Sequence, residues 1–258
     1  MLYWWRQGAF QLNVALCPIL QEILVISRLF FLDLTQSRQW LSSFQRKALS
    51  EIINVSFANI DAVEYLAKYF DSPVPYQRKL RLYLHNEQIV GYCLLTFTDM
   101  SDCTVIKASA AFLPQYRKGG NTFLFSIQEG FKSWLKRPWR KHYYADTMLS
   151  PAMYRAIAKN TAIIWPHFVH QAPKELFDRF NPDGQSSNEN PLRCLVLVDR
   201  TSNYSQQELK MLRSSDKPEI QYYCQINPHF DKGVALFVIV PVNLRQFVQS
   251  LIKILRKV

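Results

Sequence analysis

Apolar side chains recur along this chain with two different periods, and the change between them predicts where helices give way to strands. Between residues 35 and 70 they recur every three or four positions, as in helices with one buried face. The turn sequence DSPVP follows, and beyond it apolar residues alternate with polar ones or form short unbroken runs, as in strands. Helical and strand patterns then alternate to the end of the chain, which predicts an α/β protein.

The helical patterns predict which side chains are buried. The first helix is expected to begin with Thr35 as its N-cap, the third to run over about 121–135, and the fourth to begin at Pro151. The C-terminal stretch VNLRQFVQSLIKILRKV is strongly amphipathic; we expect its apolar stripe to cover a sheet, and an acidic membrane surface is the alternative. The residues expected to face inward are Leu41, Phe44, Ala48, Leu49, Ile52 and Ile53 in the first helix, Val63, Leu66, Ala67 and Phe70 in the second, Leu124, Ile127, Phe131, Trp134 and Leu135 in the third, and Leu244, Phe247, Val248, Leu251, Ile252, Leu255 and Val258 in the last.

The strand patterns predict a sheet whose first three strands follow one another directly. Asn86-Glu87 fits a tight hairpin turn between the first two strands, and TDMSD separates the second from the third. Three neighbouring strands joined in this way form an antiparallel run. The expected strands lie at 79–85, 88–97, 104–113, 142–148, 194–198, 221–225 and 234–240.

Composition narrows the class of the protein and of its partners. Apolar residues make up 48% of the 258 positions, enough for a sizeable core, and the net charge of +11 favours anionic partners such as nucleotides, nucleic acid or acidic membrane. The five cysteines show no CxxC spacing, which argues against a disulfide framework and a zinc site, so no metal is assigned. Charged and polar residues interrupt the most apolar early stretch, and no signal peptide is visible. We therefore expect a soluble, cytoplasmic protein without a transmembrane segment.

The stretch FLPQYRKGGNT places two of the chain's seven glycines side by side, directly before a helical pattern. Adjacent glycines let successive backbone N–H groups point into one concavity, and a helix N-terminus adds unpaired N–H groups and a positive dipole end. Arg117 and Lys118 supply further positive charge. The loop matches neither the P-loop pattern nor GxGxxG, but its chemistry suits a diphosphate. The alternative is an ordinary strand-to-helix turn with solvated charges.

The order of these elements resembles the GNAT superfamily of coenzyme A-dependent N-acyltransferases. The signature of that family is Arg or Gln, two residues, Gly, one residue, then Gly or Ala, at the start of the helix after the fourth strand. Here Arg117-Lys118-Gly119-Gly120-Asn121-Thr122 matches at the Arg and at the first Gly and departs at Thr122. The strand sequence ASAAFLP before the loop and the run ADTMLSPAMYRAIAKN after it are also similar to the family. The resemblance covers about residues 30–170 closely and the remainder loosely.

The resemblance implies a mixed, mostly antiparallel sheet flanked by helices. It also implies a V-shaped gap where the family's fourth and fifth strands, here 104–113 and 142–148, part. Acetyl-CoA or another acyl-CoA would be the acyl donor, with its pantetheine bound along the backbone of the fourth strand like an added strand and its pyrophosphate on the glycine loop. No metal is implied. The residues that this places in cofactor binding are Ala111, Phe112, Leu113, Arg117, Lys118, Gly119, Gly120, Asn121 and Thr122.

The resemblance also suggests groups that manage protons. The family's acid is commonly a tyrosine on the helix after the fifth strand; Tyr154 lies on that helix, but earlier than the commonest position, which Ile157 occupies. A packing role for Tyr154 is the alternative. Asp146, near the expected gap, and His142, at the far end of the same strand, are the candidates for a base, and a water relay is the alternative to both.

The whole chain is thus expected to be an N-acyltransferase that transfers an acyl group, most simply acetyl, to an amine. Residues 1–30 form an N-terminal extension and residues 31–258 a single GNAT-like domain, more divergent over 171–258. The alternative is a non-catalytic binding module that holds RNA or acidic membrane through its basic surface, of which the run KRPWRKH is the densest part. Nucleic acid is not the favoured partner, the acceptor is left open, and a homodimer is an option.

Overall fold

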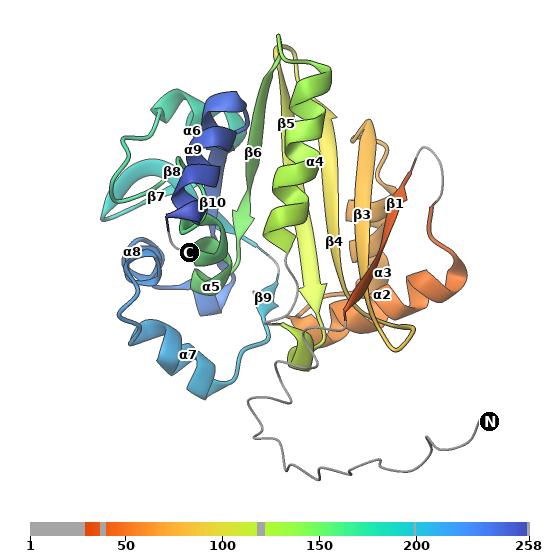
Figure 1. Ribbon diagram of the computed structural model, residues 1–258. Helices are drawn as coiled ribbons and strands as arrows, with labels where there is room; N and C mark the ends of the chain where they lie inside the picture. The colour runs from red at the N-terminus through yellow and green to blue at the C-terminus, as the bar shows by residue number, and fades with distance from the viewer. Residues whose placement is uncertain (1–28, 37–39, 118–121, 199, 257–258) are drawn as a thin grey trace, which may run out of the picture.

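One eight-stranded sheet runs through the protein in the computed structural model, which describes residues 29–36, 40–117, 122–198 and 200–256. Figure 1 shows the sheet with helices on both faces. Its strands in spatial order are β1 (Phe30–Thr35), β3 (Gln77–His85), β4 (Gln88–Asp99), β5 (Cys103–Phe112), β6 (Lys141–Met148), β10 (Val234–Pro241), β8 (Asn190–Leu197) and β7 (Gln185–Ser187). A separate two-stranded ribbon pairs β2 (Phe57–Ala58) with β9 (Thr201–Ser202).

Every neighbouring pair in the large sheet is antiparallel except β5 and β6, which are parallel. Their pairing begins at Cys103 opposite Lys141 and ends at Ile106 opposite Tyr144. Beyond that point β5 stays with β4 while β6 stays with β10, so the two strands diverge. The predicted fold class, a mixed and mostly antiparallel sheet flanked by helices, is confirmed. The strands predicted at 104–113 and 142–148 part as the resemblance implied.

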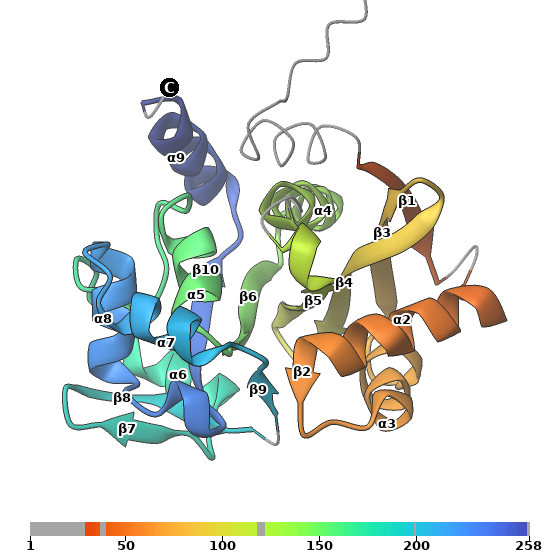
Figure 2. The ribbon, with the colours of Figure 1, turned by 90° about the horizontal axis from the view of Figure 1, so that it is seen from below.

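Two groups of helices cover opposite faces of the β3–β4–β5 part of the sheet (Figure 2). On one face α2 (Ser43–Ser56), α3 (Ala62–Leu66) and the π-helical turn η1 (Ala67–Asp71) bury their apolar side chains against the strands. On the other face lies α4 (Thr122–Lys136), which follows the short 3-10 turn η2 (Pro114–Tyr116). The remaining helices, which accompany β10, β8 and β7, are α5 (Pro151–Ala158), α6 (Lys174–Phe180), α7 (Gln206–Arg213), α8 (Pro218–Ile226), the turn η3 (Phe230–Lys232) and α9 (Leu244–Leu255).

The start of the first helix differs from the prediction. Ser42 is the N-cap: its hydroxyl accepts a hydrogen bond from the Gln45 N–H at 3.2 Å, and its own N–H donates to the Gln45 side chain at 2.9 Å. This reciprocal pair satisfies two otherwise unpaired backbone donors. Thr35 instead ends the edge strand β1, which the sequence did not reveal because Phe30, Phe31 and Leu32 show no alternation.

Several helices turn a different face inward from the one predicted. Val63 is 73% exposed, and in α4 Leu124 and Leu135 are 53% and 55% exposed. The side of α4 that packs on the sheet carries its buried residues, Phe125 and Gly130. Gly130 has no side chain, so the helix can approach Ile106 of β5 closely. The segment 221–225, predicted as a strand, is helical in α8. Its buried residues recur at the helical spacing and are Ile220, Tyr223 and Ile226.

The prediction that the apolar stripe of the C-terminal helix covers the sheet is wrong. The side of α9 that is buried is polar: the Gln246 amide exchanges two hydrogen bonds with the backbone of Ile163, at 3.0 and 2.7 Å. The Ser250 hydroxyl accepts from the Ala162 N–H at 2.9 Å. These bonds satisfy loop backbone groups that a buried apolar stripe would leave unpaired. The exposed residues of the stripe are Leu244, Val248, Leu251, Ile252 and Leu255, and Val258 lies outside the described residues.

Arg140 fastens the closed end of the β5–β6 pair to the turn between β4 and β5. Its guanidinium donates to the carbonyl of Cys103 at 2.7 Å and to the Thr104 hydroxyl at 3.2 Å, and it lies 3.5 Å from the Asp99 carboxylate. Thr104 in turn donates to Asp99 at 2.7 Å. The two strands are therefore tied together at one end and free to part at the other.

Gly91 on β4 lies directly opposite Phe112 on β5, and the aromatic ring covers it. A Cβ at residue 91 would overlap this buried ring, so we expect Gly91→Ala to lower the free energy of unfolding by about 1–3 kcal/mol. Gly130→Ala is the matched control, because a Cβ there meets Ile106 and Val242 at 3.6 and 3.8 Å, which are ordinary contacts. In mid-helix it should stabilise by about 0.5–1 kcal/mol. Urea unfolding of both variants measures the difference; equal stability of the two would contradict the prediction.

No helix among the described residues is both long and apolar enough to cross a membrane.

Candidate functional site

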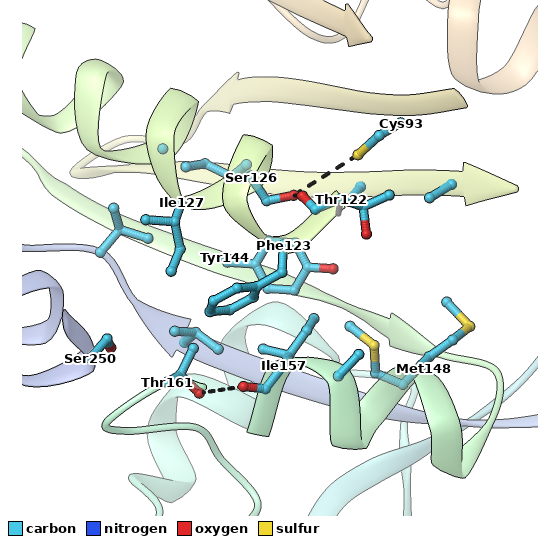
Figure 3. A pocket seen from close by; sticks show the side chains of 18 of the residues that line it. Cys93, Thr122, Phe123, Ser126, Ile127, Tyr144, Met148, Ile157, Thr161 and Ser250 are labelled. Carbon is cyan, nitrogen blue, oxygen red and sulfur yellow. Dashed lines mark hydrogen bonds between the residues drawn. The ribbon is translucent and has the colours of Figure 1, made fainter. Parts of the chain in front are cut away.

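A cavity of about 350 Å³ lies where β5 and β6 part, between α4 on one side and α5 and α9 on the other. Figure 3 shows Phe123 of α4 and Tyr144 of β6 directed into it, with Ile157 of α5 on the opposite wall. At the α9 end Phe131 and Phe247 stack with ring centroids 4.1 Å apart. The volume and the mostly apolar walls are those of a small-molecule site.

Polar groups gather at the end of this cavity where α4 begins. Arg117 and Thr122 both line it, and Thr122 is the first residue of α4, whose N-terminal end carries a partial positive charge. The Arg117 guanidinium also donates to the carbonyl of Asn203 at 3.4 Å. Lys118, Gly119, Gly120 and Asn121, predicted to bind the cofactor, lie outside the described residues. Arg117 and the N-terminal end of α4 therefore place positive charge at one end of an apolar cavity.

A second cavity, of about 60 Å³, lies at the same gap on the side of α3. Aromatic side chains form one wall, among them Tyr65 and Tyr69, and charged side chains complete it: Asp146 from β6, Lys107 from β5, and Arg200. The described residues that line both this cavity and the larger one are Ala108, Ala110, Thr147 and Met153. The two cavities therefore approach each other through the gap between β5 and β6, with small side chains on β5 at the junction.

Asp146 occupies the gap itself. One carboxylate oxygen accepts the backbone N–H of Ala108 across the gap at 2.7 Å, and the other accepts the N–H of Thr147 at 2.8 Å. The Asp146 carboxylate thus accepts the Ala108 N–H, which a carbonyl of β6 would accept if β5 and β6 were still paired at this point. Burial raises the pKa of Asp146 above the usual value for a carboxyl, although both hydrogen bonds and the charges of Lys107 and Arg200 oppose the shift. A carboxylate of raised pKa, open to a cavity, is suited to accept a proton.

The β5 residues whose backbone N–H and C=O groups face the gap differ from the predicted set, which was Ala111, Phe112 and Leu113. The N–H of Leu113 donates to the carbonyl of Val90 at 2.9 Å, so it points toward β4. Since successive residues of a strand point their backbone groups to opposite sides, Ala111 also faces β4, while Ala108, Ala110 and Phe112 face the gap. The Phe112 carbonyl accepts from the Ser56 hydroxyl at 3.1 Å. Ala110 is thus a candidate for binding an extended ligand that the sequence reasoning passed over, and Ala111 and Leu113 are not suited to it.

The tyrosine predicted as an acid does not lie at the gap. Tyr154 is fully buried in the core beside Tyr223, its hydroxyl donates to the carbonyl of Pro166 at 2.9 Å, and it lines neither cavity. Its position fits the alternative of a packing tyrosine. Tyr144 is the tyrosine that lines the larger cavity; burial raises the pKa of its phenol well above the usual value and keeps it protonated. His142 lies at the closed end of β6, where its Nδ1 donates to the carbonyl of Arg140.

Cys93 is the cysteine that lines the larger cavity, and it is not an activated nucleophile. Burial raises the pKa of its thiol to about 12. The thiolate, which is the reactive form, is therefore a negligible fraction near neutral pH. This favours direct attack by an acceptor over an acyl-enzyme intermediate.

The basic run KRPWRKH lies at the closed end of the sheet, away from both cavities. Both of its arginines make internal contacts: Arg137 binds the Asp99 carboxylate at 2.7 Å, and Arg140 binds the strand ends as described above. Their charges are partly neutralised, which weakens the case for a nucleic-acid surface there. Within the described part of the chain, no three His, Cys, Asp or Glu side chains are grouped to hold a metal ion.

No protein-family model matches the sequence, and no curated protein matches it. The structure is similar to several solved ones. The ribosomal-protein-S18-alanine N-acetyltransferase from Escherichia coli matches with a TM-score of 0.36 and 9% identity, over 83% of this chain and 96% of that one. The loading GNATL domain of CurA from Lyngbya majuscula matches with a TM-score of 0.38 and 10% identity, over 83% and 98%.

A GNAT family acetyltransferase from Elizabethkingia anophelis, with acetyl-CoA bound, is also similar, with a TM-score of 0.33 and 13% identity over 63% of this chain and 92% of that one. Likenesses this loose do not extend to activity or to individual residues. The fold class rests on the described part of the sheet itself: its strand order, the one parallel pair found there, which diverges after Ile106, and the helix α4 that comes after β5. In these features the chain has a GNAT-like fold.

Proposed function

We propose that the protein is an N-acyltransferase that moves an acyl group, most simply acetyl, from coenzyme A to an amine. The observation that carries this proposal is the pair of cavities that approach each other through the β5–β6 gap, with the Asp146 carboxylate at the junction. Two substrates that enter from opposite faces of the sheet would meet there. Holding them together converts a bimolecular encounter into a positioned attack, which supplies much of the rate enhancement.

The larger cavity fits an acyl-CoA. Its apolar walls suit the pantetheine arm, and the gap-facing backbone of Ala110 and Phe112 can bind an amide-containing chain like an added strand. Arg117 and the start of α4 provide positive charge for the diphosphate, and the glycine pair Gly119-Gly120 supplies the bare backbone predicted to complete that site. The thioester, when bound, supplies the acyl carbon to which the amine nitrogen bonds as the carbon–sulfur bond breaks.

Asp146 accepts the proton that the amine must lose. Its carboxylate faces the smaller cavity, on the acceptor side of the gap, and its raised pKa brings it closer to the working range of a general base. On the donor side, Tyr144 lines the larger cavity with a protonated phenol, which can hydrogen-bond to the departing sulfur. Tyr144 therefore replaces Tyr154 as the acid that we propose.

The experiment that tests this function is incubation of the purified protein with acetyl-CoA and a panel of amines, with release of free coenzyme A thiol and mass of the acetylated product as the readouts. We expect turnover with at least one amine, with double-reciprocal plots that intersect because both substrates bind before transfer. The Tyr144→Phe variant, which removes only the hydroxyl, is assayed beside the wild type for a lower kcat. Tight binding of RNA or acidic lipid without binding of coenzyme A would favour the non-catalytic module instead.

A further inference from the structure

Arg200 is held in the smaller cavity by aromatic rings. Its guanidinium carbon lies 5.3 Å from the ring centroid of Tyr69, 5.4 Å from that of Tyr65 and 5.8 Å from that of Phe57. One terminal nitrogen also donates to the Tyr69 hydroxyl at 3.0 Å. Three rings and a hydrogen bond fix the direction of the guanidinium, so little freedom remains to be lost when it binds a ligand.

The guanidinium has a donor that the described residues leave unused. Its Nε is buried and has no hydrogen-bond partner anywhere in the described part of the chain. A buried donor without a partner is costly, and such a group commonly marks a place where a ligand or a water supplies the missing acceptor. A guanidinium suits a planar carboxylate best, because its parallel N–H groups match the two oxygens.

The charges around the cavity are unbalanced in a way that points to the same ligand. Arg200 and Lys107 contribute two positive charges, and Asp146 contributes one negative charge. Arg200 and Asp146 both line this small cavity, so one small molecule bound there can contact both side chains. A bare amine would be attracted to Asp146 but repelled by both cations, whereas a molecule that carries an amine and a carboxylate would complement all three groups.

We propose that the acceptor is a small amino acid, whose carboxylate binds Arg200 while its amine lies against Asp146. This inference rests on the proposed acyl transfer and specifies its acceptor class. The cavity volume of about 60 Å³ is room for on the order of four water molecules, enough for the amine and carboxylate of an amino acid. Lys107 is exposed, so a side chain of the acceptor can extend past it into solvent.

The test compares L-alanine with L-alaninamide, which differ only in the carboxylate. We expect the wild-type protein to acetylate L-alanine with a kcat/KM about 10- to 100-fold higher, the range for a hydrogen-bonded charge pair. Alaninamide has the less basic amine and would be the better acceptor on basicity alone, so this preference can come only from recognition of the carboxylate. Equal use of both acceptors, or a preference for the amide, would overturn the proposal.

The Arg200→Gln variant locates the effect. We expect it to lose the preference for alanine while its affinity for coenzyme A stays unchanged. Arg213→Gln is the matched control, because Arg213 also lies over an aromatic ring, that of Phe230, and binds the Asp231 carboxylate, but lines neither cavity. If Arg200→Gln does not fold, the comparison of the two acceptors on the wild type decides alone.

Failure of this inference can be told from failure of the proposed function. Turnover of amines without a preference for the carboxylate would overturn only the inference. If no amine is turned over, ligand-observed NMR with L-alanine and L-alaninamide decides: binding of alanine alone, lost in Arg200→Gln, would support the carboxylate site, and its absence in the wild type would refute it.

Discussion

Replacement of Asp146 by asparagine should lower kcat by about 10²- to 10⁴-fold and leave the affinity for acetyl-CoA nearly unchanged. The asparagine keeps the size of the side chain, and its single oxygen can accept only one of the two backbone N–H groups, those of Ala108 and Thr147, that the two carboxylate oxygens accept. It cannot take a proton from the acceptor. We propose that the cofactor binds in the larger cavity, which Asp146 does not line, so the affinity for acetyl-CoA should not change. Initial rates and calorimetric titration of acetyl-CoA measure the two quantities separately.

The pH dependence of kcat gives a second test of the same residue. A general base works in its deprotonated form, so kcat should fall as the pH drops through the pKa of Asp146. Because burial raises that pKa, the fall should begin at a higher pH than it would for an ordinary aspartate. In Asp146→Asn this acidic limb should be absent. The exposed residue Asp183, outside both cavities, provides the control variant Asp183→Asn, and an acidic limb that survives in Asp146→Asn would show that another group is the base.

The second large effect is expected from Gly120→Glu, which should reduce the affinity for coenzyme A by at least about 10²-fold without unfolding the protein. Gly120 lies outside the described residues, and this expectation rests on the sequence RKGGNT and on its described flanks, Arg117 and Thr122, at the end of the larger cavity. A glutamate there would bring negative charge to the diphosphate, and like charges brought together cost several kcal/mol.

Two control variants separate charge from bulk in this experiment. Gly120→Ala adds a methyl group without charge, and Gln128→Glu adds the same charge to an exposed position of α4 that lines neither cavity. Calorimetric titration of coenzyme A into the four proteins, with thermal melts to confirm folding, gives the comparison. Undiminished affinity in a folded Gly120→Glu variant would exclude this loop as the diphosphate site.

The sequence predicted those parts of the fold that follow from local pattern. The strands β3 to β6 and β10 were found because their apolar residues alternate or run together, and Asp146 was found because it stands near the end of such a strand. The faces of helices were predicted less well, since α9 buries glutamine and serine to satisfy a neighbouring loop, a need that no pattern within the helix records. The sequence 221–225 looks like a strand from its tyrosines alone, but Pro218 begins a helix there.

The acceptor side of the site could not have been predicted. Arg200 and Tyr65 are far apart in the chain and meet only because β9, beside Arg200, pairs with β2, near α3. The gap-facing backbone of Ala110 was missed for a related reason: the side to which a strand points its N–H groups depends on its register with its neighbours. Here the bond from Leu113 to Val90 sets that register.

Because Arg140 ties β5 and β6 together at one end, the width of the gap at the other end depends on the angle between the two strands. β6 pairs with β10, and β10 pairs with β8. In the described structure no residue of β10 or β8 lines the smaller cavity. Different packing of β10 and β8 would widen or narrow the gap between β5 and β6 without changing any side chain that lines the smaller cavity. The layer formed by β10 and β8 can in this way change which substrates fit the gap while the chemical groups stay in place.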